Sequence, residues 1–367
     1  KDCNAKLVIS HRDFIKRLGH VLEDVQVLGV MPSKTIKLSY NITNPLELNN
    51  LHVPEWANLI EKEAPILNKF LMRPMMRYTS GSTGKPKGII RRQKATPDGL
   101  VDYYQTLRKL AASMFSFKAG AHFMTAAPLY HSGPSTLISM ALAMETMSAT
   151  ILPRFDPENF LQIIENRKIT HIYLVPTMMA RLLKLPKTIK DKYDLSSVEF
   201  CVSTGSPWSH EIKSAMISWW GPVFWETYGA SELGFVTLVS SEEALQRPGT
   251  VGKIQQGGSI KIYDSNKKEL GPGQVGDIYI KTDAFGKFVY SEANETKTRQ
   301  EIDGHVSVGD MGWLDDKDYL FVSDRKKDMI ISGGVNIFPV EIENFLSGAP
   351  FIADVAVFGA PDDEFGE

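Results

Sequence analysis

The sequence contains only two cysteines, Cys3 and Cys201, and has no long uninterrupted apolar run. Two cysteines cannot supply the disulfide framework of a small secreted domain, so the composition predicts a reduced, cytoplasmic setting. The longest apolar stretch, Leu137 to Leu152, contains Glu145 and is shorter than the roughly 20 residues that a membrane-spanning helix needs. The sequence therefore predicts no transmembrane segment, and it leaves peripheral contact with a membrane surface open.

An excess of charge of one sign is also missing. Lysine and arginine total 41 and the acidic residues total 43, which gives a formal net charge of −2 at pH 7. A near-neutral chain lacks the general attraction to phosphate backbones that non-specific nucleic-acid binding needs, so nucleic acid is not an expected partner. With 367 residues, of which 43% are hydrophobic, the chain can bury a large core.

The pattern of apolar runs predicts an α/β architecture followed by a mostly β segment. Apolar runs alternate with helical patterns from residue 6 to about residue 226, which is typical of a parallel sheet. Asp156 and Pro157 predict the N-cap and first turn of a helix. From residue 235 to 290, short β-runs broken by glycines predict antiparallel hairpins or a small barrel. The expected strands include Ala121 to Ala126, Ser148 to Leu152, Thr170 to Val175, Val198 to Val202, Ser259 to Tyr263 and Asp277 to Lys281.

The ends of the sequence carry two further expectations. Residues 6–30 predict a β-α-β unit, and residues 325–367 predict the beginning of a small α+β unit. That second unit is expected to contain a strand at Met329 to Ile331, a helix from Pro339 and a strand at Asp354 to Phe358. Cys201 lies inside an apolar strand pattern, so we interpret its thiol as structural and not as a nucleophile.

Hydroxyls, glycines and lysines are concentrated in residues 78–88. Glycines let the backbone approach an anion, hydroxyls add adaptable donors, and a lysine adds a mobile positive charge, so this segment predicts a phosphate-binding loop. It is not a Walker A loop, because the residue five after Gly81 is Pro86. A flexible linker is the alternative. The linker is disfavoured by Lys85 to Gly88, which follow at once, and by the apolar residues on both sides.

These residues resemble the signature loop of the acyl-adenylate-forming superfamily, which comprises acyl-CoA synthetases, adenylation domains of peptide synthetases and firefly-type luciferases. AMP-forming acyl-CoA synthetases are the most similar group. Further segments follow in the family's order: Tyr228 to Glu232, Gly309 to Trp313, Asp324 to Asp328, Ser332 to Gly334 and Pro339 to Glu343. The resemblance implies a large N-terminal domain of two doubly wound sheets plus a small β-barrel subdomain, and then a small α+β lid domain. The expected bounds are 1–324 for the large domain, with 235–324 mostly β, and 325–367 for the beginning of the lid.

The resemblance also implies a nucleotide site. The residues that match the loop holding the β- and γ-phosphates are Thr79, Ser80, Gly81, Ser82, Thr83, Gly84 and Lys87. The residues that match the adenine surroundings are Gly205, Ser206, Pro207 and Tyr228, and Gly229 is a further residue expected to bind ATP or AMP. Ser231 stands where the family more often has threonine and keeps a hydroxyl for the α-phosphate. Glu232 suits Mg²⁺, which takes one or two protein carboxylates and otherwise phosphate oxygens and water.

Three further positions complete the implied site. Asp310 fits the ribose hydroxyls, Arg325 matches the arginine that contacts the nucleotide, and Lys327 falls at the hinge of the lid. Gly333 and Gly334 resemble the loop that lines the tunnel for coenzyme A. Taken without the neighbouring motifs, these residues have simpler interpretations: Tyr228 as a core residue, Glu232 as a solvated turn acid, and Asp324 to Asp328 as a surface charge cluster.

The segment Pro128 to Pro134 bears on the substrate. Amino-acid-activating relatives have an aspartate in this region, and here no acid occurs between Ala121 and Met144. His131 resembles the histidine that lines the carboxylate site of acyl-CoA synthetases, and Ser132 and Gly133 are small enough to border an acyl pocket. A structural histidine is the alternative. The segment therefore favours a medium or long fatty acid, or another apolar acid.

The implied activity is ligation of an acid to coenzyme A with ATP and Mg²⁺, as in fatty acid metabolism, with Lys87, His131, Glu232 and Arg325 as catalytic residues. The alternatives are a module that loads a carrier protein, a nucleotide-binding relative without catalysis, and a luciferase-like activity. Family members have more sheet and helix before residue 6 and an adenylating lysine near the end of the lid. The chain is therefore expected to be truncated at both ends and to adenylate poorly by itself. The sequence does not predict the oligomeric state.

Overall fold

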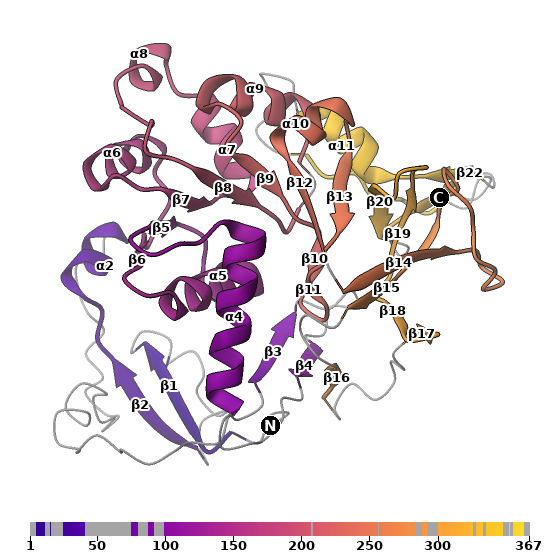
Figure 1. The fold of residues 1–367 in the computed structure, drawn as a ribbon, viewed down its shortest axis with the longest axis horizontal. Helices are drawn as coiled ribbons and strands as arrows, with labels where there is room; N and C mark the ends of the chain where they lie inside the picture. The colour runs from indigo at the N-terminus through magenta and orange to yellow at the C-terminus, as the bar shows by residue number, and fades with distance from the viewer. Residues whose placement is uncertain are drawn as a thin grey trace.

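The computed structural model describes residues 5–11, 15, 25–40, 75–79, 87–91, 99–206, 208–255, 257–282, 288–291, 300–325, 328–332, 335–347, 352 and 355–362. A parallel sheet flanked by helices forms one part of the molecule, and antiparallel strands form the other (Figure 1). The two parts are continuous, because a 13-stranded sheet runs through both in the order β17-β18-β15-β19-β20-β13-β12-β9-β8-β7-β5-β6, with β14 paired to β15.

The parallel part confirms the α/β expectation. Its strands are β5 (His122–Thr125), β6 (Ser148–Ile151), β7 (His171–Tyr173), β8 (Phe200–Ser203) and β9 (Phe224–Glu226). All four residues of β8 are buried, as expected for a strand covered on both faces. Cys201 is fully buried, and burial raises the pKa of its thiol, which makes it a poor nucleophile.

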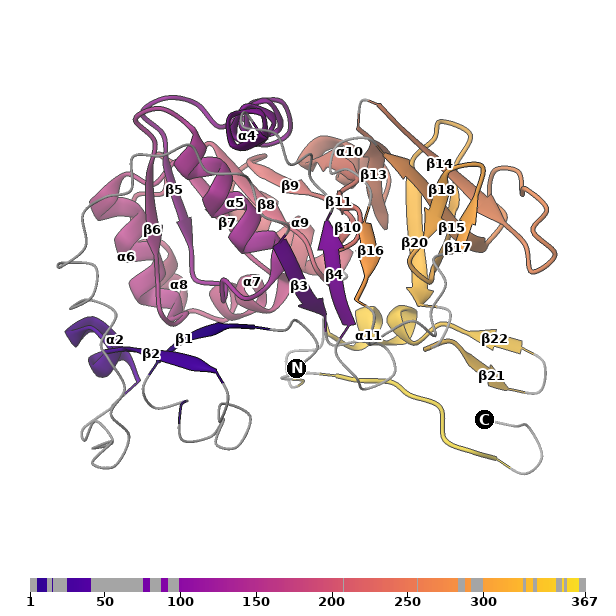
Figure 2. The same cartoon turned by 90° about the horizontal axis from the view of Figure 1, so that it is seen from below.

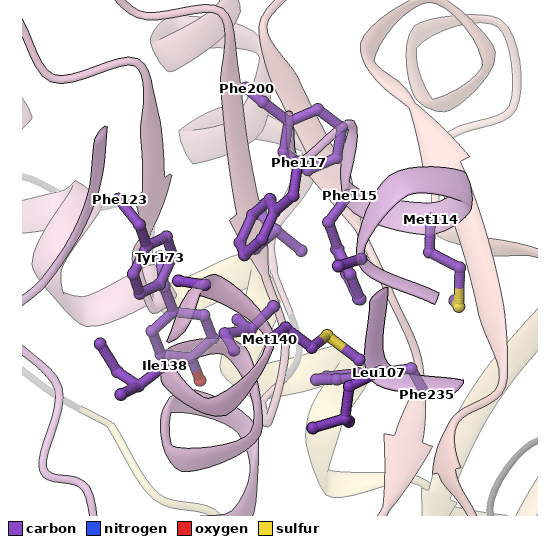
Figure 3. Close-up of a cluster of buried hydrophobic side chains, with 14 of the residues drawn as sticks. Leu107, Met114, Phe115, Phe117, Phe123, Ile138, Met140, Tyr173, Phe200 and Phe235 are labelled. Carbon is purple, nitrogen blue, oxygen red and sulfur yellow. The ribbon is translucent and has the colours of Figure 1, made fainter. Parts of the chain in front are cut away.

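Helices cover both faces of this sheet and define two cores. The helices are α4 (Gly99–Phe115), α5 (Ser132–Ala143), α6 (Pro157–Arg167), α7 (Pro176–Leu183), α8 (Lys187–Lys190) and α9 (His210–Trp220). Successive strand residues point to opposite faces. Phe200 accordingly packs with α4 and α5 (Figure 3), whereas Cys201 packs with α6, α7 and α9. The Asp156 side chain caps α6 by accepting from the Asn159 N–H at 2.9 Å, as predicted.

The antiparallel part confirms the hairpins expected after residue 235. It comprises β12 (Thr237–Ser240), β13 (Thr250–Ile254), β14 (Gly258–Tyr263), β15 (Gly276–Thr282), β17 (Gln300–Ile302), β18 (His305–Ser307), β19 (Asp310–Leu314) and β20 (Leu320–Arg325), with the short helix α10 (Ser241–Gln246) after β12. Strand β12 joins the two parts, because it pairs with β9 on one side and with β13 on the other.

A separate three-stranded sheet lies between the two parts. It contains β3 (Met75–Thr79), β4 (Lys87–Arg91) and β16 (Phe288–Tyr290), in the order β16-β4-β3, as Figure 2 shows. Strands β3 and β4 pair antiparallel, with Thr79 opposite Lys87. The two ends of the predicted phosphate loop are therefore brought together. A short ladder of β10 (Gly229–Ala230) and β11 (Gly234–Phe235) follows the parallel strands.

The terminal segments contain some of the elements that the sequence predicts. Strands β1 (Leu7–His11) and β2 (Gln26–Val30) pair in parallel, and α2 (Lys34–Ser39) follows. The two strands of the predicted β-α-β unit are thus present as a two-stranded sheet, and residues 12–14 and 16–24 between them lie outside the described residues. Near the C-terminus, β21 (Ile330–Ser332) and α11 (Pro339–Ser347) match the expected strand and helix, and an unpredicted strand, β22 (Val335–Ile337), pairs antiparallel with β21.

One expectation at the C-terminus is wrong. Residues 355–358 form no strand, because no described strand pairs with them, and a strand exists only through its hydrogen-bonded neighbour. Separately, none of the helices formed by the described residues combines the length and hydropathy that crossing a membrane would require.

Candidate functional site

Three of the predicted site residues meet at the point where β19 begins and β20 ends. Asp310 opens β19 and lies opposite Arg325, the last residue of β20. Tyr228, far away in sequence, donates its hydroxyl to Asp310 Oδ2 at 2.5 Å, and Arg325 Nε lies 3.5 Å from Asp310 Oδ1. The structure thus brings together three residues that the sequence assigned to adenine, ribose and the nucleotide.

The electrostatics of this cluster depend on burial. Burial raises the pKa of Asp310, and the Tyr228 hydroxyl and the Arg325 charge oppose that rise. Burial and the neighbouring carboxylate also raise the pKa of Tyr228, so this residue stays a neutral donor. The Arg325 side chain is 60% exposed, whereas the Asp310 side chain is 12% exposed. A buried carboxylate can accept hydrogen bonds from two vicinal hydroxyls, and an exposed cation beside it can bind a phosphate.

Strand β16 connects Glu232 to the phosphate hairpin, which consists of β3 and β4 on either side of the predicted phosphate loop. Tyr290 of β16 donates its hydroxyl to Glu232 Oε1 at 3.1 Å, and Tyr290 lies opposite Ile89 of β4. Among the described residues, no three His, Cys, Asp or Glu side chains converge on a common point. Glu232 could therefore offer a cation one carboxylate and no ready-made cage, which suits Mg²⁺ bound mainly to phosphate oxygens and water.

The predicted acid-binding turn occupies the N-terminus of α5. His131 is the N-cap residue, is exposed, and makes no capping hydrogen bond through its side chain. The Ser132 hydroxyl lies 3.0 Å from the Ser231 hydroxyl, so this turn directly contacts the nucleotide motif, residues Tyr228 to Glu232. A side chain added at Gly133 would come within 3.4 Å of both the Tyr173 hydroxyl and Thr204 Cγ2. Position 133 therefore lies within contact distance of β7 and of the loop after β8.

The predicted adenine loop follows β8. Gly205 has a φ of 98°, a conformation that favours glycine, and Ser206 is exposed. The Tyr173 hydroxyl donates to the Thr204 carbonyl at 3.3 Å and steadies the start of this loop. The loop thus leaves the carboxyl end of a parallel strand, where open α/β sheets bind their ligands.

Several predicted residues cannot be placed. Ser80, Gly81, Ser82, Thr83, Gly84, Pro207, Lys327, Gly333 and Gly334 lie outside the described residues. Thr79 and Lys87 are described only as paired strand ends. The phosphate, hinge and tunnel assignments of these residues stay predictions.

Sequence reasoning missed three residues that contact the site. Arg77 Nη1 donates to the Ser132 carbonyl and to the Thr136 hydroxyl, both at 3.1 Å. Tyr290 supports Glu232, and the Asp324 carboxylate accepts the Val340 N–H at 3.2 Å, which ties β20 to α11. Only Asp324 lay inside a quoted motif, and the partners of the other two are distant in sequence.

A family model described as AMP-binding enzyme matches residues 1–288. The chain belongs to the AMP-binding enzyme family. This result confirms the resemblance to the acyl-adenylate-forming superfamily that the motifs indicated.

Individual relatives agree with this assignment. The chain is 31% identical over 292 residues to the medium/long-chain-fatty-acid–CoA ligase FadD8 of Mycobacterium tuberculosis, a match that covers 79% of this chain and 49% of the relative. It is 29% identical over 361 residues to the 2-succinylbenzoate–CoA ligase of Oceanobacillus iheyensis, which covers 96% of this chain and 70% of the relative. Among solved structures, ATP-bound MatB from Rhodopseudomonas palustris has a TM-score of 0.76 at 25% identity, covering 98% of this chain and 67% of that chain. Measured against the FadD8 relative, this chain spans about half the length.

Proposed function

We propose that the protein is an AMP-forming ligase that joins a carboxylic acid to coenzyme A. The observation that carries the proposal is the convergence of Tyr228, Asp310 and Arg325, with Asp310 held by the Tyr228 hydroxyl and faced by a mostly exposed arginine. This geometry suits a nucleotide whose ribose hydroxyls meet Asp310 and whose phosphates lie toward Arg325. The family assignment and the names of the relatives, two of which are CoA ligases, support the same activity.

The first half-reaction joins two anions. An oxygen of the acid attacks the α-phosphorus of ATP, the bond to the β-phosphate breaks, and pyrophosphate leaves. Because both partners are negative, positioning and charge neutralisation supply most of the acceleration. In the proposal, Arg325 and Lys87 neutralise phosphate charge, Ser231 contacts the α-phosphate, and His131 faces the acid. Mg²⁺, when held by Glu232, would neutralise further charge on the phosphates.

The second half-reaction replaces AMP by a thiol. The coenzyme A thiolate attacks the carbonyl carbon of the acyl-adenylate, the bond from carbon to the phosphate-linked oxygen breaks, and AMP leaves. Gly333 and Gly334 stay predicted to border the thiol arm. No acidic residue occurs between Ala121 and Met144, the segment that includes the turn at His131. This absence supports an apolar acid as the substrate.

The test is ATP-dependent thioester formation by the full-length protein with free coenzyme A and a panel of octanoate, decanoate, palmitate, benzoate and phenylacetate. The proposal predicts thioester with at least one acid, AMP and pyrophosphate as co-products, and a much lower rate in Asp310→Asn. Pyrophosphate release without thioester would indicate a carrier protein as acceptor. ATP binding without pyrophosphate release would indicate a non-catalytic relative, and light emission would indicate a luciferase-like activity.

A further inference from the structure

Arg77 connects two segments that the proposed function assigns to different substrates. It belongs to β3 and directly precedes residues 78–88, the predicted phosphate loop. Its Nη1 donates to the Ser132 carbonyl and to the Thr136 hydroxyl, both at 3.1 Å. Both acceptors lie in the first turns of α5, next to the predicted acid-binding turn. One side chain therefore spans from the phosphate hairpin to the acid site.

Ser132 extends this connection to the nucleotide motif. Its carbonyl accepts from Arg77, and its hydroxyl lies 3.0 Å from the Ser231 hydroxyl. Ser231 precedes Glu232, which in turn accepts from Tyr290 of β16 in the same sheet as β3. A hydrogen-bonded route thus runs from the phosphate hairpin through the acid-binding turn to the residues proposed to meet the α-phosphate and Mg²⁺.

The guanidinium of Arg77 lies where burial and the helix dipole each disfavour a positive charge. The guanidinium is half-buried, and burial lowers its pKa, although arginine stays charged in proteins. Its charge also lies at the N-terminus of α5, where the helix dipole disfavours cations. Residues whose local placement lowers the stability of the fold are expected at functional sites.

We propose that Arg77 is a positioning residue that couples nucleotide binding to acid binding. This inference rests on the proposed function and adds a residue to it. When a nucleotide binds at the predicted phosphate loop, the guanidinium of Arg77 holds the first turn of α5 in position, and the acid meets His131 and Ser132 already placed. By reciprocity, a bound acid strengthens nucleotide binding by the same factor.

The experiment measures this coupling without turnover, on the full-length protein. The affinity for α,β-methylene-ATP is determined by calorimetry in the absence and in the presence of saturating acid, using the panel acid that gives the most thioester. The wild type is expected to bind the analogue about 5-fold or more tightly with acid present, at the lower end of usual coupling between sites. In Arg77→Met the factor falls below about 2-fold, while the affinity for each ligand alone changes less than about threefold.

Two further variants separate positioning from structure. Thr136→Val removes one of the two acceptors of Arg77 and keeps its charge, so it is expected to reduce the coupling factor partially. It also tests the inference if Arg77→Met fails to fold. Ser139→Ala is the matched control, because Ser139 donates to the Ser135 carbonyl at 2.9 Å on the same helix and is neither of the two acceptors named for Arg77. This control is expected to keep the wild-type factor.

The outcomes distinguish the two proposals. A wild-type coupling factor in either Arg77→Met or Thr136→Val, or a wild type that forms thioester but shows no coupling, overturns the role of Arg77 and leaves the ligase intact. Equal losses of affinity for each ligand alone, with the factor retained, also overturn it, because they indicate a structural role. A wild type that neither binds the analogue nor forms thioester overturns the proposed function, and the inference with it.

Discussion

Two acid–base pairs flank the nucleotide motif, and they differ in their access to water. Lys213 of α9 and Glu226 of β9 form an ion pair whose side chains are 5% and 8% exposed. The Lys213 ammonium also lies 5.1 Å from the centre of the Trp208 ring. In the second pair, the Asp310 side chain is 12% exposed but that of Arg325 is 60% exposed. We call Lys213–Glu226 the sealed pair and Asp310–Arg325 the half-open pair. The sealed pair can only stabilise the fold, whereas in the half-open pair a ligand can replace one partner.

The largest expected effect comes from breaking the sealed pair. Lys213→Met leaves the Glu226 carboxylate buried without a partner, and we expect a loss of about 3–5 kcal/mol in the free energy of unfolding. Urea denaturation followed by tryptophan fluorescence measures it. The control is Lys213→Met combined with Glu226→Leu, which removes both charges and should recover most of the loss. A single variant as stable as the wild type would contradict the account of this pair.

The stability loss in Lys213→Met is also expected to depend on pH. Burial raises the pKa of Glu226 above its ordinary value of 4.5, and Lys213 opposes that rise. A raised folded-state pKa means that this carboxyl favours folding at low pH and that the contribution is lost as pH rises through that pKa. Without Lys213 the pKa rises further. The stability gap between wild type and Lys213→Met should therefore widen from pH 5 to pH 8, and a constant gap would contradict this prediction.

Asp310→Asn is expected to separate binding from stability in the half-open pair. It should weaken nucleotide affinity about 10- to 100-fold, as expected for hydrogen bonds to a charged group worth about 1.5–3 kcal/mol. Because burial raises the pKa of Asp310, its ionised form costs stability at neutral pH. The free energy of unfolding of the variant should therefore equal or exceed that of the wild type. Calorimetry with ATP and urea denaturation test both parts, and unchanged ATP affinity would refute the ribose assignment.

A smaller effect is expected from Tyr228→Phe, which keeps the aromatic ring but removes the donor to Asp310 Oδ2. Loss of this hydrogen bond should cost about 1 kcal/mol of stability and weaken nucleotide affinity several-fold, because Asp310 is no longer oriented. The comparison with Tyr228→Leu isolates the ring. If Tyr228→Phe and Tyr228→Leu bind ATP equally, the ring makes no stacking contribution.

The smallest effect on stability is expected from Arg325→Gln. An exposed ion pair contributes little, so the free energy of unfolding should change by less than about 0.5 kcal/mol. Pyrophosphate formation should nevertheless slow, because the exposed guanidinium is proposed to meet the phosphates. A matched loss of stability and rate would indicate that Arg325, like Lys213, serves the fold.

The sequence predicted the features that depend on local pattern. The buried run around Cys201 identified a covered parallel strand, and Asp156 with Pro157 identified the start of α6. Motif order anticipated the meeting of Tyr228, Asp310 and Arg325. The contact of Arg77 with Ser132 and that of Tyr290 with Glu232 could not be predicted, because each joins residues more than 50 positions apart and depends on how β3 and β16 are placed. The strand expected at 354–358 was wrong because an extended pattern does not specify a partner.

The most direct test of the proposed chemistry follows one oxygen atom. Full-length protein is incubated with ATP, coenzyme A and an acid labelled with ¹⁸O in its carboxylate, and the AMP formed is analysed by mass spectrometry. If the acid oxygen attacks the α-phosphorus and the thiol later expels AMP, each AMP carries one labelled oxygen. Unlabelled AMP, or ADP as the nucleotide product, would contradict the account.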